Sequence, residues 1–112
     1  MPASAKPSLR FFHSAALRTR SKKVLAAVER DEDPTQHAGA LSMLVVDLTE
    51  AGLKYYFLKP LQQAQVGFVA RQTASLGMAG SLRVMSPIIR SILAGTNATQ
   101  MRVIARHIRQ LM

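Results

Sequence analysis

The stretch LSMLVVDLTEAGLKYYFL, residues 41–58, decides how this sequence can fold. Its apolar side chains return in steps of three and four residues, which places them along one face of an α-helix. We call this face the central seam, and its members are Leu41, Leu44, Leu48, Ala51, Tyr55 and Leu58. A helix with such a seam needs a partner surface, so we expect other helices or a second copy of the chain to cover it.

The same stretch is apolar around most of its circumference and leaves one narrow charged strip. The strip consists of Asp47, Glu50 and Lys54, and the last two stand four residues apart in the order that favours an ion pair. A helix this apolar belongs in the middle of a bundle or in a subunit interface, because one contact stripe cannot bury all of it. Pro60 is expected to kink or end the helix, since proline removes a backbone donor and crowds the preceding turn.

Length and composition favour a single domain. The chain has 112 residues, enough to bury about two-thirds of its unfolded surface. It contains no cysteine, which excludes disulfides and thiolate metal sites. No run approaches the roughly eighteen apolar residues of a membrane span, and we expect a cytoplasmic protein. The apolar share of 48% is high for a chain with 15 lysines and arginines, and oligomer formation accounts for both numbers.

Charge is distributed unevenly along the chain. The formal net charge is +9, and all 6 acidic residues lie between Glu29 and Glu50. From Ala51 to Met112 the charged side chains are lysines and arginines alone, and none is a carboxylate. Such asymmetry indicates an acidic protein, a nucleic acid or an anionic lipid surface as the partner. The alternative is that the arginines only keep an apolar surface soluble.

We expect four parts along the chain: a disordered tail (1–8), a basic amphipathic helix (9–30), an acidic linker (31–39) and a helical bundle core (40–112). The basic helix has no acidic residue before Glu29 and is rich in arginine and serine, so it resembles a mitochondrial presequence. A mitochondrial location is therefore the alternative to the cytoplasm.

The acidic linker is considered as a metal site because it combines carboxylates with an imidazole. Asp31, Glu32, Asp33 and His37 are acceptable ligands for a divalent cation, but their spacing does not match a calcium-binding loop. We expect an acidic helix end followed by a solvated loop.

Three further helices are expected after Pro60: one from residue 61 that fades at Gly77 and Gly80, one over 87–94 and one over 98–112. Ser86 and Pro87 are typical of a helix start, and Asn97 with Gln100 forms the pattern of a capping box. No strand pattern is sustained. The predicted fold class is all-α, a compact bundle of four to five helices that self-associates through the central helix.

Catalysis has no support among the sequence motifs. His13, His37 and His107 are far apart, and none belongs to a catalytic or phosphate-binding motif. We therefore expect no enzymatic activity, no cofactor, no bound metal and no small-molecule substrate.

The favoured hypothesis is a non-enzymatic helical interaction or assembly protein, a homo-oligomer, that presents an arginine-rich face to an acidic protein or another polyanion. The expected assembly surface is the central seam. The expected contact residues lie on the last helix and on the first: Arg102, Arg106 and Arg109, then Arg18, Arg20, Lys22 and Lys23.

Two alternatives use the same basic residues. Residues 87–112 have the outline of a helix-turn-helix, whose second helix enters the major groove of DNA. Its exposed face offers mainly arginines, which contact phosphate and carry little base recognition. In the other alternative, helix 9–30 lies on an anionic membrane surface.

Overall fold

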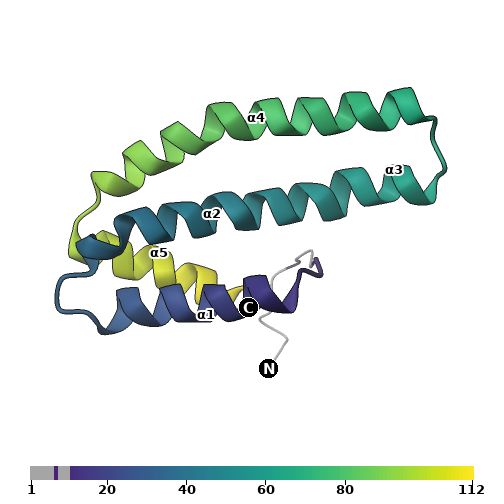
Figure 1. Cartoon of the computed structure of the whole chain (residues 1–112). Coiled ribbons are helices and arrows are strands. Elements are labelled where there is room, and N and C mark those ends of the chain that lie inside the picture. The colour runs from purple at the N-terminus through teal and green to yellow at the C-terminus, as the bar shows by residue number, and fades with distance from the viewer. Residues whose placement is uncertain (1–6, 8–10) are drawn as a thin grey trace.

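The computed structural model describes residue 7 and residues 11–112, and every regular element in these residues is helical (Figure 1). The all-α prediction is confirmed. The predicted tail, residues 1–8, lies outside the described residues except for Pro7. The elements in chain order are α1 (Ala15–Arg30), η2 (Pro34–His37), α2 (Ala38–Leu53), η3 (Lys54–Leu58), α3 (Lys59–Gln63), α4 (Phe68–Ala94) and α5 (Ala98–Gln110).

The helix that was expected to kink or stop at Pro60 instead continues to Gln63. α2, η3 and α3 form one long rod (Figure 1). Proline crowds the carbonyl four residues before it, and η3 is a single wide π-helical stretch placed just N-terminal to Pro60. The wider turn changes the spacing of the carbonyls before Pro60, so the helical backbone can continue past this proline into α3.

α4 is one helix of 27 residues, and the breaks predicted at Gly77, Gly80 and Pro87 are wrong. It runs back along α2 as the second half of a long hairpin (Figure 1). Glycine costs a helix interior about 1 kcal/mol and proline about 3 kcal/mol relative to alanine. Burying Leu82 and Leu93 against the rest of the chain offsets much of this cost, at about 1.5–3 kcal/mol for each leucine. The expected separate helix over 87–94 is therefore the end of α4.

The core lies where α1 and α5 cover the N-terminal half of α2 (Figure 1). The central seam supplies Leu41 and Leu44, which are completely covered, and Leu48 packs against them. The remaining core residues come from the other three helices: Leu25, Val28, Leu93, Met101 and Ala105. This half of the seam is thus covered by helices of the same chain.

Local capping sets the ends of the outer helices. α1 begins at Ala15 and not at residue 9, because the Ser14 hydroxyl accepts a hydrogen bond from the Leu17 amide at 3.0 Å. The predicted capping box of the last helix is confirmed. The Asn97 side chain accepts from the Gln100 amide at 2.8 Å, and the Gln100 side chain accepts from the Asn97 amide at 2.9 Å. α5 ends at Gln110, two residues before the predicted end.

Candidate interaction surfaces

Two of the three arginines expected on the contact face of the last helix bind groups of the same chain. Arg109 donates to both carboxylate oxygens of Glu29 on α1, at 2.7–3.0 Å. This hydrogen bonding raises the pKa of Arg109. Arg102 donates to the backbone carbonyl of Asp31 at 3.1 Å, where α1 ends with unpaired carbonyls. Both side chains hold α5 against α1, although Arg109 is still partly exposed; Arg106 is exposed as well.

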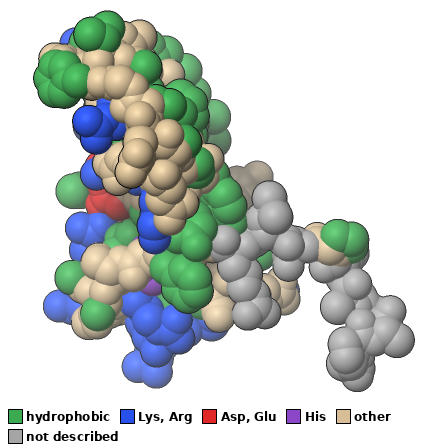
Figure 2. Space-filling model, turned by 90° about the vertical axis from the view of Figure 1, so that its right-hand side faces the viewer, with side chains coloured by type: hydrophobic (Ala, Val, Ile, Leu, Met, Phe, Trp, Pro, Cys, Tyr) green, Lys and Arg blue, Asp and Glu red, His purple; other side chains and the backbone are tan. Residues whose placement is uncertain are grey.

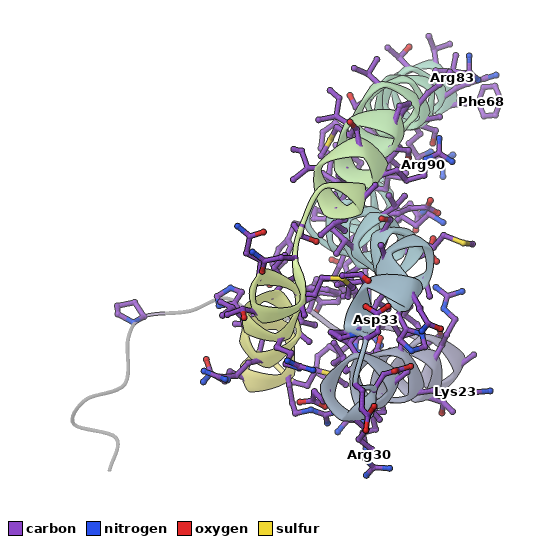
Figure 3. The ribbon with its side chains drawn as sticks, turned by 90° about the vertical axis from the view of Figure 1, so that its left-hand side faces the viewer. Lys23, Arg30, Asp33, Phe68, Arg83 and Arg90 are labelled. Atoms are coloured by element: carbon purple, nitrogen blue, oxygen red, sulfur yellow. The ribbon has the colours of Figure 1, made fainter. Side chains whose placement is uncertain are left out.

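The basic residues of α1 divide between two sides of that helix. Arg20 pairs with Asp47 on α2, so its charge is offset within the chain. Arg18 and Lys22 are exposed and share the side of Glu29, as the steps of four and seven residues require. Lys23 is also exposed, and it points away from the body of the protein on another side (Figure 3).

The most prominent exposed arginines lie on α4 and were missed as a site by the sequence analysis. Arg83 and Arg90 are seven residues apart, which is about two helical turns, and extend from one side of α4 (Figure 3). Lys23 extends toward the same side of the molecule. We call Lys23, Arg83 and Arg90 the basic face. Within residue 7 and residues 11–112, none of its three members forms a salt bridge.

Apolar side chains accompany the basic face. A hollow of about 150 Å³ opens at the boundary of α2 and α4, and Arg90 lines it together with Met43 and Val46. Ser86 and Asp47, whose carboxylate pairs with Arg20, complete the lining. Met43 is 62% exposed beside this hollow. Phe68, at the start of α4, is 69% exposed and extends toward the same side (Figure 3). The basic face can therefore offer a partner both charge-assisted hydrogen bonds and apolar anchoring points.

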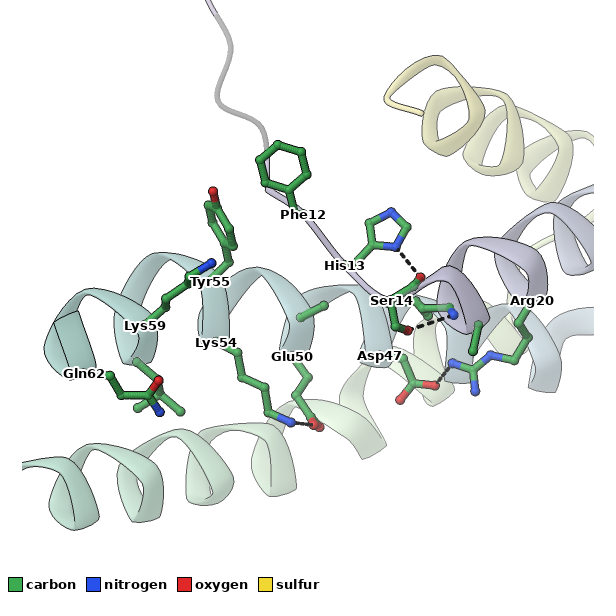
Figure 4. A pocket seen from close by; sticks show the side chains of 14 residues that line it. Phe12, His13, Ser14, Arg20, Asp47, Glu50, Lys54, Tyr55, Lys59 and Gln62 are labelled. Atoms are coloured by element: carbon green, nitrogen blue, oxygen red, sulfur yellow. Dashed lines mark hydrogen bonds and ion pairs between the residues drawn. The ribbon is translucent and has the colours of Figure 1, made fainter.

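The second half of the central seam lines an open groove of about 890 Å³ between the segment that leads into α1 and the long rod (Figure 4). Tyr55 is part of its wall. The Phe12 and Tyr55 rings pack edge to face, with their centres 5.9 Å apart. The Lys59 ammonium lies 5.0 Å from the centre of the Tyr55 ring. The other seam residues in the groove wall are Ala51 and Leu58.

Most charges in the groove already have partners. The predicted pair of Glu50 and Lys54 is confirmed at 2.8 Å, and Arg20 binds Asp47 at the other end (Figure 4). His13 shares a 3.1 Å hydrogen bond with the neighbouring Ser14 carbonyl. The described residues of the groove wall thus carry mostly paired charges beside the aromatic rings of Phe12 and Tyr55.

The acidic linker uses its polar groups to shape the turn between α1 and α2. The Asp31 carboxylate accepts from the Asp33 amide at 3.0 Å and lies 2.8 Å from the His37 ring. These two contacts lower the pKa of Asp31, the Asp33 amide having the larger effect. In the part of the chain that the structure describes, no three side chains of the metal-binding types come together. No helix of the described part is long and apolar enough to cross a bilayer.

We compared the chain with protein-family models, with curated proteins and with solved structures, and none of these comparisons gave a match.

Proposed function

We propose that this is a non-enzymatic interaction protein that presents the basic face, Lys23, Arg83 and Arg90, to an acidic partner protein. The observation that carries the proposal is the exposure of Arg83 and Arg90 on one side of a rigid helix. The chain has no carboxylate after Glu50, so α4 contains nothing of its own to offset these charges. We propose the cytoplasm as its compartment, with the mitochondrion as the alternative suggested by the acid-poor N-terminus.

The contrast between the two arginine sets supports this choice of face. Arg102 and Arg109 already donate to α1, and a partner would have to displace those bonds before using them. Within the part of the chain that the structure describes, Arg83 and Arg90 form no salt bridge that a partner would have to displace. Arginine is enriched at protein interfaces because its planar fork binds carboxylates with two parallel hydrogen bonds.

The apolar neighbours of the basic face favour a protein over a nucleic acid. Methionine and aromatic residues are enriched at protein interfaces, and Met43 and Phe68 are both exposed here. Surfaces that bind DNA are more polar and more strongly positive. In the helix-turn-helix alternative, α5 would have to read the groove, yet Arg102 and Arg109 bind the chain itself.

For the membrane alternative, Phe12, just before α1, is 82% exposed and could contact lipid. Leu17 and Val24 of α1, by contrast, pack against the core cluster. α1 would have to leave the bundle to expose them.

The test is a fluorescence anisotropy titration with labelled poly-L-glutamate at several salt concentrations, and in parallel with a random DNA duplex. We expect poly-L-glutamate to bind with an affinity that falls as salt rises. Arg83→Gln combined with Arg90→Gln should weaken binding roughly tenfold, about 1.4 kcal/mol.

The matched control is Arg18→Gln combined with Lys22→Gln, which removes the same charge from another side of the molecule. An equal loss of affinity in both double variants would mean that only net charge matters. DNA binding that is tighter than poly-L-glutamate binding, and sensitive to the α4 variants, would reassign the basic face to nucleic acid.

A further inference from the structure

α4 carries a second row of residues, and all of them except the half-buried Ala74 are exposed. Its members follow each other in steps of four and three residues, the spacing of a seam between helices. We call this the outer row: Ala70, Ala74, Gly77, Ser81, Val84, Ile88 and Ile92. Val84 is 65% exposed and Ile88 is 54% exposed, although both are branched apolar residues. The opposite side of α4 uses Leu82 and Leu93 to pack against the rest of the chain.

The outer row contains no charged residue. Arg83 and Arg90, the charged residues nearest to it, project to the other side of the helix (Figure 3). In the upper part of Figure 2, hydrophobic side chains follow one edge of the long hairpin, and lysine or arginine side chains lie along the other edge. A chain with a net charge of +9 therefore has one extended surface that is both uncharged and partly apolar.

Gly77 leaves room for another backbone to approach this row. A methyl group built on Gly77, or on Gly80 outside the row, would meet no atom within 4 Å among the described residues, so no contact there requires glycine at either position. Glycine in a helix interior costs about 1 kcal/mol relative to alanine. Its lack of a side chain is useful where another backbone approaches closely.

We infer that the outer row of α4 is the surface through which two copies of this chain form a dimer. The row is small in its first half and branched in its second half. In an antiparallel pair centred near Ser81, Ile88 of one copy faces Ala74 of the other, and Ile92 faces Ala70. Large side chains then meet small ones along the whole row, and a two-fold axis repeats each contact. This complementarity with itself identifies a second copy as the occupant.

Charge and area agree with this choice of partner. Two copies repel each other through most of their surface, but the outer row contributes no repulsion and leaves both basic faces outward. The row spans 22 residue steps, or about 33 Å, on a single helix. A contact that also includes the adjoining side of the rod, in a hairpin about 20 Å wide, would cover roughly 650 Å² per copy, against roughly 800 Å² per partner in a standard interface.

The first test is the molar mass in solution, measured by light scattering after size exclusion over a wide range of concentrations. We expect a dimer of the 12.3 kDa chain. Gly77→Leu and Ile88→Lys should give monomers with unchanged helicity by circular dichroism. Their controls add the same side chains to other sides of α4: Ala79→Leu and Val69→Lys should remain dimers. A wild type that stays monomeric, or equal effects in target and control, would overturn the inference.

The second test uses the absence of cysteine from the chain. Ser81→Cys should form a disulfide-linked dimer under mild oxidation, because the two copies of this position meet at the two-fold axis, whereas Ala79→Cys should not. Equal crosslinking of both would contradict the predicted register. Binding to phosphatidylcholine vesicles that Ile88→Lys abolishes would identify lipid, and not a second copy, as the occupant. These outcomes do not depend on the basic face, since Arg83→Gln with Arg90→Gln should leave the mass unchanged.

Discussion

Leu44→Ala should cost this protein a large part of its stability, whereas Met43→Ala should cost little. Leu44 is 1% exposed within the cluster formed by α1, α2, α4 and α5, and Met43 beside it is 62% exposed. Truncating a fully buried leucine removes its transfer free energy and leaves a cavity, for a total of about 2–5 kcal/mol. A domain of this size has roughly 5–15 kcal/mol of stability. We expect a loss near 3 kcal/mol for Leu44→Ala, equivalent to roughly 12 °C in Tm.

The assay is urea denaturation followed by circular dichroism, with all variants at the same protein concentration because dimerisation contributes to apparent stability. Met43→Ala removes a side chain of similar size from the surface and should change the free energy of unfolding by less than about 0.5 kcal/mol. If the two substitutions destabilise the protein equally, or if Met43→Ala costs more, the central seam does not face the core as described.

Three further changes test local features. Asn97→Ala removes the capping box of α5 and should lower the free energy of unfolding by about 1 kcal/mol; no change in a urea titration would argue against the cap. Pro87→Ala should stabilise α4 by up to about 3 kcal/mol and so raise the Tm, because it restores a backbone donor inside the helix; a lower Tm would contradict this expectation. Asp31→Asn should lower stability near pH 7, since the Asp33 amide and His37 hold the pKa of Asp31 below its ordinary value of 3.8. A lowered carboxyl pKa stabilises the fold above that ordinary value, so the gap between wild type and variant should shrink as the pH falls below 3.8; a gap that widens there would contradict the assignment.

The features that sequence alone predicted correctly depend on neighbouring residues. The capping box of Asn97 and Gln100 needs only side chains three residues apart. The pair of Glu50 and Lys54 needs only one helical turn. The all-α fold class follows from apolar periodicity, which persists along most of the chain.

The features that the sequence did not reveal depend on contacts between distant segments. Gly77, Gly80 and Pro87 each weaken a helix locally, and the packing of α4 along α2 overrides them. Splitting α4 at Pro87 placed Arg83 and Arg90 in different elements, so their common side was not seen. The spacing of seven residues between them was the available signal.

The arginines of α5 were predicted as contact residues, but two of them bind a distant segment of the same chain. Their exposure was inferred from the polar side of one helix, but Glu29 lies 80 residues before Arg109 in sequence. A periodic pattern cannot show that two such residues meet. In the fold, Arg102 and Arg109 of the predicted contact face therefore form hydrogen bonds within the chain.

If both proposals hold, the dimer presents two basic faces on the sides away from its contact surface. A partner with repeated acidic segments could then engage both, and the second contact would form at a high effective concentration. Variants of the outer row should in that case weaken binding to long poly-L-glutamate more than binding to short oligomers.

The central claim, that the basic face binds an acidic partner, is tested most directly by an amide NMR titration of the ¹⁵N-labelled chain with poly-L-glutamate. We predict that the largest chemical-shift changes surround Arg83 and Arg90 on α4 and extend to Met43, which lines the same hollow as Arg90. Shifts concentrated instead around Arg18, Lys22 and Arg106, or spread evenly over all basic residues, would contradict the account.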